Sequence, residues 1–302
     1  MSVKVRIVAV AVLASCLAPA CSDGQGSPAG ERVDSAFERG RQGDYQAIRE
    51  LATLDASNVP RVAKYLGDPV QVLRVEALGV LEAFNACGEI TSALTNSSAE
   101  IRERAAASFF RACGIAAVDA GVALALRESL QMGNGSAASL LLLGASGDAR
   151  SAAILRERSA GKGLVKWAMD SQPVPEALAA KVALFRAGDA GVRPSLVKSL
   201  ANPDPAVARF FLDAIAFIQD REALELLSRR LEDTRLLLNE RRRRICDYAV
   251  PAFARRFHLK LSFEIRDFGP YDERQRKEVR AAVNTEIARM GGAIQERRPS
   301  PE

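Results

Sequence analysis

Apolar residues recur at three- and four-residue spacing along most of the chain after Glu31. Side chains at that spacing share one face of a helix, so the pattern predicts amphipathic helices. The helices are short, and similar polar turn residues recur between them, which indicates a repeated unit. Two clear apolar sets are Phe37, Ile48, Leu51 and Leu54, and Leu73, Ala77, Leu78, Leu81 and Phe84.

One recurring phrase is an Asp that opens a helix, with a Leu seven places further on. Three of the four Asp residues follow a Gly. A Gly suits the left-handed turn that ends one helix, and the Asp carboxylate caps the start of the next. The phrase therefore predicts tight helix–helix turns, at Asp44/Leu51, Asp148/Leu155, Asp189/Leu196 and Asp220/Leu227.

A second phrase has a Leu, an Asp or Asn two places on, and an apolar residue at the seventh place. An Arg follows closely each time, as Arg74, Arg102 and Arg209. We expect the Asp or Asn to cap the new helix. The phrase occurs at Leu66/Asp68/Leu73, Leu94/Asn96/Ile101 and Leu200/Asn202/Val207.

The alternation of these two phrases resembles HEAT repeats, particularly the short-helix variant also seen in phycobilisome lyases. The match covers about Asp44 to Phe257 and blurs over Ala116 to Ser146. The resemblance implies an all-α fold, an α-solenoid of HEAT-like helical hairpins, with a ladder of turn Asp and Arg residues. Arg209 stands one place late for that ladder. A pair of short helices cannot bury its apolar face alone and must stack on neighbours, which favours the solenoid over a single irregular bundle.

The C-terminal end departs from the repeat and predicts a capping helix block. Leu236 to Phe257 has the pattern of one longer helix with Pro251 inside it, and Leu259 to Asp267 alternates like an extended segment. Tyr271 to Met290 predicts a final helix started by Asp272. We assign residues 32–257 to the solenoid and residues 258–302 to the C-terminal cap and tail.

The N-terminus has the pattern of a signal peptide, residues 1–20. Two basic residues precede an uncharged run from Ile7 to Ala20, which is shorter than the roughly 20 residues that span a bilayer. The segment resembles a bacterial lipoprotein signal, cleaved before Cys16 or Cys21, and residues 21–31 have the composition of a flexible tether. An ordinary signal-peptidase site after Ala18-Pro19-Ala20 is the alternative. We expect a cell-envelope protein, membrane-anchored and facing the periplasm, or alternatively a secreted or soluble periplasmic one.

Charge adds one candidate interaction site. The chain is 26% charged with a net charge of +5, and removal of residues 1–20, which hold Lys4 and Arg6 but no acid, leaves a net charge of +3. That is too little for a dedicated nucleic-acid binder, so no nucleic-acid partner is expected. The excess positive charge lies after residue 220 and is densest at residues 241–244. Arg241 and Arg244 are therefore candidates for binding an acidic protein surface or anionic lipid. A solvated helix with Glu240 and Asp247 as local counter-charges is the plainer interpretation.

Two cysteines, Cys87 and Cys113, repeat a Phe-x-Ala-Cys-Gly phrase. The spacing places both near the C-terminal ends of equivalent helices, in an oxidising compartment where a disulfide is possible. Packed helices lie about 8–10 Å apart, however, and bridged Cα atoms need about 4.4–6.8 Å. The distances favour two buried free thiols over the bond.

Little in the sequence suggests catalysis. His258 is the single His, and the cysteines lack metal-ligand spacing, so we expect no metal and no cofactor. Trp167 fits a core or groove aromatic. The pattern favours a non-enzymatic scaffold that binds a protein partner and is tethered to a bacterial envelope membrane. The alternative is a ligand-binding or enzyme-accessory module with a pocket near Trp167.

Overall fold

The computed structural model describes residues 28–133, 135–167, 172–237, 243–267 and 269–295. The chain is mostly helical, with 72% helix and 2% strand, which confirms the predicted all-α class. The α-helices are α1 (Pro28–Arg41), α2 (Tyr45–Arg49), α3 (Val59–Ala63), α4 (Gln71–Ala83), α5 (Cys87–Ala93), α6 (Ala99–Cys113), α7 (Ala120–Gln131), α8 (Ala137–Ala145), α9 (Ala149–Ser159), α10 (Glu176–Arg186), α11 (Arg193–Leu200), α12 (Pro205–Asp213), α13 (Arg221–Ser228), α14 (Ile245–Phe257) and α15 (Glu273–Gln295). Helix α1 begins at Pro28, inside the segment predicted to be a tether.

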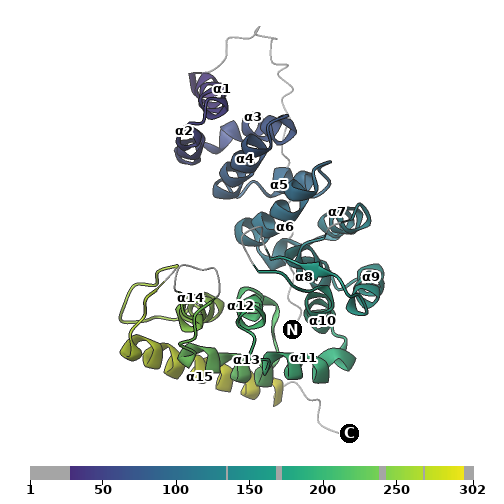
Figure 1. The fold of residues 1–302 in the computed structure, drawn as a ribbon, viewed down its shortest axis with the longest axis vertical. Coiled ribbons are helices and arrows are strands. Elements are labelled where there is room, and N and C mark those ends of the chain that lie inside the picture. Colours follow the sequence, from purple (N-terminus) through teal and green to yellow (C-terminus); the bar gives the residue numbers. More distant parts are fainter. Residues whose placement is uncertain (1–27, 134, 168–171, 238–242, 268, 296–302) are drawn as a thin grey trace, which may run out of the picture.

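The helices follow one another as pairs, from α1/α2 to α13/α14 (Figure 1). Second helices of successive pairs contact each other, as α2 with α4, α4 with α6, α6 with α8 and α12 with α14. First helices do the same on the other side, as α11 with α13 and α13 with α15. The row of helices bends, and α4, α6, α12 and α14 lie on the inner side of the bend while α7, α9 and α11 lie on the outer side.

A short antiparallel hairpin precedes α10 and was not predicted. Strand β1 (Leu164–Val165) pairs with β2 (Val174–Pro175), with Val165 opposite Val174. Val165 and Val174 are buried, and the backbone N–H of Ala137 donates to the carbonyl of Lys166 at 2.8 Å. The hairpin therefore joins the start of α8 to the start of α10.

Helix α8 is buried on every side. Its first eight residues, Ala137 to Gly144, are all buried. Helix α10 packs so closely on it that a Cβ atom added to Gly144 would lie 2.4 Å from the backbone oxygen of Ala183. Gly144 is thus a residue whose missing side chain sets the distance between two helices.

The predicted Asp caps are present. Asp44, Asp148, Asp189 and Asp220 are all N-cap residues, and each carboxylate accepts a hydrogen bond from a backbone N–H of the helix or 3₁₀ turn that follows. Gly43, Gly147 and Gly188 before them have φ of +97°, +65° and +95°. The turn chemistry expected from the sequence is confirmed at these positions.

The second phrase works differently from the expectation. Asp68 and Asn96 accept hydrogen bonds from the backbone N–H groups of Val70 and Ser98, at 2.9 Å each, before the helices begin. Val70 and Ser98 are themselves the N-cap residues, so the expected capping by Asp68 and Asn96 is wrong. The side chains form a turn one step earlier because their oxygens bond the backbone two residues on.

The arginines of this phrase bind turn carbonyls. The Arg74 Nη1 atom donates to the carbonyl of Asp68 at 2.7 Å, and the buried Arg102 donates to the carbonyls of Asn96 at 2.8 Å and Gly133 at 3.2 Å. The Asn96 amide donates to the carbonyl of Leu66 at 3.0 Å, which links consecutive turns. Backbone carbonyls that have no partner in their own helix are satisfied in this way.

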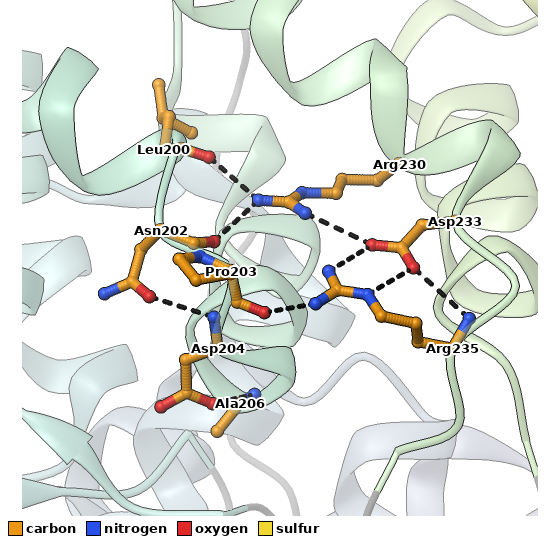
Figure 2. A network of polar contacts seen from close by, with 8 residues as sticks. All are labelled: Leu200, Asn202, Pro203, Asp204, Ala206, Arg230, Asp233 and Arg235. Atoms are coloured by element: carbon orange, nitrogen blue, oxygen red, sulfur yellow. Dashed lines mark hydrogen bonds and ion pairs between the residues drawn. The ribbon is translucent and has the colours of Figure 1, made fainter.

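At the turn after α11 the next pair supplies the arginines (Figure 2). Arg230 donates to the carbonyls of Leu200 and Asn202 at 3.0 and 2.8 Å, and Arg235 to that of Pro203 at 2.6 Å. Asp233 binds both arginines. The late Arg209 instead forms an ion pair with Asp213, so the network continues there with different residues.

The C-terminal expectations need two corrections. Helix α14 begins at Ile245, not near Leu236, because Leu236 and Arg244 pair as an isolated bridge ahead of it. Leu259 to Asp267 has no strand, because it lacks a partner strand among the described residues. The final helix, α15, does follow Asp272, whose carboxylate accepts from the Gln275 N–H at 2.8 Å. It packs against α13 and α14.

Candidate functional site

A candidate binding surface lies on the inner side of the bend, where α4 is located (Figure 1). Helix α4 turns an outward stripe toward solvent that is nearly without charge: Val72, Val75, Gly79 and Ala83. Val72 is 41% exposed, whereas Leu73, Ala77 and Leu81 on the opposite side of the helix are fully buried. The periodic pattern in the sequence marked the buried side of α4, and the outward stripe was not singled out.

An aromatic cluster fills the corner of the bend. The ring of Trp167 lies edge-on to Phe110 of α6, with ring centroids 5.6 Å apart, and Phe217 lies 5.2 Å from Phe110. Phe217 belongs to the 3₁₀ turn η6 (Ile215–Phe217) after α12. Three segments far apart in sequence therefore meet at Trp167, which packs against the core as predicted.

The hollow beside Trp167 is small. Trp167, Val174, Arg209 and Leu237 help to line it, and its volume is about 10 Å³. A single water molecule needs about that much space, so the hollow does not admit an organic ligand as it stands. The guanidinium of Arg209 lies over the ring of Tyr248 at 3.6 Å, which packs this polar group against α14.

Burial changes the ionisation of an acidic side chain near this corner. Desolvation raises the pKa of Glu103 on α6, although the positive charges of Lys166 and Arg102 act in the opposite direction. A carboxylate pair for acid–base catalysis needs a second such group close by. The described residues offer Glu100 nearby, but it forms an ion pair with Arg104.

The predicted basic site divides into two parts. Arg241 lies outside the described residues. Arg244 is not part of a helix face, because it precedes α14 and its side chain binds Asp247 at 2.8 Å and the carbonyl of Tyr271 at 2.9 Å. Its guanidinium therefore joins α14 to the start of α15, and contact of Arg244 with a partner stays a prediction.

Cys87 and Cys113 form a disulfide, with Cα atoms 5.9 Å apart. The two residues are not at equivalent helix ends, as the repeated phrase suggested: Cys87 is the first residue of α5 and Cys113 the last of α6. Asn85, with φ of +52°, turns the chain between α4 and α5. Helix ends can approach more closely than helix axes do, which is why the spacing argument for free thiols does not hold here.

The predicted acylation sites, Cys16 and Cys21, lie outside the described residues. Among the helices that are described, none is long and apolar enough to cross a membrane. Across the same part of the chain, no group of three or more His, Cys, Asp or Glu residues is placed to hold a metal ion. His258 is the C-cap of α14, in the left-handed conformation with φ of +49°.

Comparisons with models of protein families, with curated proteins and with solved structures found no match to this chain.

Proposed function

We propose that the chain is a non-enzymatic scaffold that binds a protein partner on the inner side of the bend and is held at a bacterial envelope membrane by a lipid anchor. In this proposal the helical pairs form an α-solenoid of the HEAT type, and α15 caps its C-terminal end. The observation that carries it is the packing of successive helical pairs, which places α4, α6, α12 and α14 along the inner side of the bend.

The outward stripe of α4 supports a protein partner. A solvent-facing row of small apolar side chains, with Val72 at its start, offers close contact to another chain without the cost of burying charge. Flanking ion pairs between helices, Arg49 with Glu76 and Arg111 with Glu82, give the stripe a polar rim. An apolar centre with a polar rim is the usual anatomy of a protein interface.

The hollows argue against the alternative of a ligand-binding module. A ligand site is typically an enclosed cavity of about 300–1,000 Å³. The hollow at Trp167 is far smaller, and larger ones, such as that of about 430 Å³ lined by Asp119, Arg127 and Asp148, are open to solvent. Within the described residues, the geometry is better suited to contact over an extended surface.

The disulfide supports an envelope location. Disulfides form and persist in oxidising compartments such as the periplasm and are rare in the cytosol. The pairing of Cys87 with Cys113 therefore agrees with the export signal expected from the N-terminal sequence.

Capture from solubilised envelope membranes tests the partner-binding surface. The tagged full chain is compared with Val72→Asp, which introduces a charge into the stripe, and with Leu124→Asp on α7 at the outer side of the bend. Leu124 is 50% exposed, so the control changes a similarly exposed apolar residue on the opposite side. We expect Val72→Asp to lose the captured partner and Leu124→Asp to retain it.

Equal capture by all three chains would overturn the inner-side assignment. Loss of capture in Leu124→Asp alone would move the surface to the outer side of the bend. Circular dichroism of each variant shows whether the helices are intact.

A further inference from the structure

Two arginines at the bend have no carboxylate partner among the residues that the structure describes. Arg186 is the last residue of α10, and Arg256 lies in the last turn of α14. Both helices contact η6, and the Arg256 side chain reaches the carbonyl of Ile218 just after that turn. Both side chains are only partly exposed.

The hydrogen-bonding groups of these side chains are largely unused. In the described part of the chain, the side chain of Arg186 has no hydrogen bond or ion pair. Arg256 donates from Nη2 to the carbonyl of Ile218 at 3.3 Å, and its Nε atom is buried without a partner. The buried Arg102 also has an Nε atom without a partner, but its Nη atoms donate to three turn carbonyls.

An acid close in sequence to Arg186 and an acid close to Ile218, which Arg256 contacts, both have other partners. Asp189 pairs with Arg156, and Asp220 pairs with Arg193. Burial lowers the pKa of both Arg186 and Arg256, and the charge of Arg186 lowers the pKa of Arg256 further. Two desolvated guanidinium groups that repel each other are stabilised by an anion placed between them.

We propose that Arg186 and Arg256 together bind a phosphate group. A phosphate carries up to two negative charges and three strong acceptor oxygens, and guanidinium forks bind it in a bidentate manner. A single carboxylate would balance one of the two arginines and offer only two oxygens. The phosphate is supplied either by free phosphate or by a phospholipid headgroup, and this proposal does not depend on the partner-binding function.

Isothermal titration of the full chain with inorganic phosphate, at constant ionic strength set with sodium chloride, tests the site. We expect saturable binding that weakens about tenfold or more in Arg186→Gln, because a hydrogen-bonded charge pair is lost. Arg229→Gln is the matched control, since Arg229 is an exposed arginine outside the site. Arg256→Gln is expected to behave like Arg186→Gln; if it does not fold, Arg186→Gln decides alone, because that side chain has no structural bond to lose.

A second arm separates the two sources of phosphate. Flotation with phosphatidylcholine vesicles, with and without phosphatidic acid, is carried out with the same variants. A headgroup is the source if the chain binds vesicles only when they contain phosphatidic acid, and if Arg186→Gln reduces this binding while Arg229→Gln does not. Free phosphate is the source if the chain binds inorganic phosphate in the titration but does not bind the vesicles. Absence of both signals in the unmodified chain, or an equal loss in Arg229→Gln, would overturn the proposal.

Discussion

Asp247 is a buried acid whose charge is retained by its neighbours. The residue is 5% exposed, and its carboxylate accepts from the Arg244 side chain at 2.8 Å and from the Tyr271 backbone N–H at 3.1 Å. Burial by itself would raise the pKa of Asp247, but these hydrogen bonds outweigh it and hold the pKa below its ordinary value. The ionised form of Asp247 therefore stabilises the contact between α14 and the start of α15.

We predict that Asp247→Asn lowers the free energy of unfolding at pH 7 by about 2–4 kcal/mol, because Arg244 loses its charged partner. Because the pKa of Asp247 is lower in the folded chain than the value of about 3.9 in the unfolded chain, its ionised carboxylate adds to the free energy of unfolding above about pH 3.9. This contribution is lost as the pH falls below that value and the carboxylate becomes protonated. The difference between wild type and variant should therefore shrink as the pH is lowered from 7 to 3. Urea unfolding followed by circular dichroism measures it.

The control for Asp247→Asn is Asp267→Asn. Asp267 pairs with Arg255, and both side chains are more than half exposed, so its loss should cost less than about 1 kcal/mol. A difference between Asp247→Asn and wild type that stays constant over the whole pH range would contradict the role given to the Asp247 charge.

Single residues also show what the sequence can predict. The Asp caps and the Gly residues with positive φ were predicted because both act through local backbone hydrogen bonds. The role of Arg244 was missed because its partner Tyr271 is brought close only by the packing of α15. Charge density along the chain does not reveal which arginines are used inside the fold.

At the scale of elements, α8 shows where the helical pattern stops being informative. Its neighbours cover it on all sides, so it has no polar face. Without a polar face, the sequence shows no alternation of apolar and polar positions from which the buried side of the helix could be predicted. The blurred region of the sequence, Ala116 to Ser146, ends in this helix. The hairpin at β1 and β2 escaped prediction because two-residue strands are too short to show alternation.

The contact between α8 and α10 yields a second prediction. Gly144→Ala should lower the free energy of unfolding by about 1–3 kcal/mol, because the new methyl group meets the Ala183 backbone and the helices must separate. Gly79→Ala on α4 is the control: a Cβ atom there has open space, and Ala favours a helix over Gly by about 0.5–1 kcal/mol. Opposite signs for the two variants in urea unfolding are the expected result, and a stabilised Gly144→Ala would refute the close approach.

The disulfide yields a third prediction, at the junction of α5 and α6. Closing a loop of this length stabilises a protein by about 3 kcal/mol, so reduction of the Cys87–Cys113 bond should lower the melting temperature. The double variant Cys87→Ser/Cys113→Ser should melt at the same lower temperature with or without reductant. Thiol titration of the denatured, unreduced chain should find two fewer thiols than after reduction, and an equal count would contradict the bond.

At the scale of the whole molecule, the contacts that accompany the bend could not be predicted from the sequence. The pairs follow from local periodicity and turn chemistry, which repeat along the chain. The bend is associated with contacts such as that between Phe110 and Phe217, which join α6 to the turn after α12. The spacing of the repeated phrases does not predict that these two residues are neighbours. They come into contact only through the packing of all the helices that lie between them in the sequence.

The proposed anchor sets how the bent array is placed relative to a membrane. If Cys21 becomes the acylated N-terminal residue, the chain from Cys21 to Pro28 reaches at most about 25 Å, since an extended chain spans about 3.3–3.6 Å per residue. The first helical pair would then lie close to the membrane surface. The surfaces at the bend would lie further along the array from the anchor than α1 does.

We predict that the chain, expressed in a bacterium with a lipoprotein pathway, is cleaved and acylated at either Cys16 or Cys21, but not at both. Cleavage before the acylated Cys makes that residue the N-terminus, so substitution of the correct Cys by Ser should abolish the modification. The other Cys→Ser variant should remain acylated and membrane-associated, and it is the matched control. Mass spectrometry of the purified N-terminus identifies the site. An unmodified chain beginning at Met1, or a chain found only in the cytosol, would show that the anchor does not exist. A single acyl chain binds a membrane only weakly, so stable attachment generally needs a second chain or a basic patch. A bacterial lipoprotein carries several acyl chains on its N-terminal Cys, and this one residue is therefore sufficient for a stable anchor.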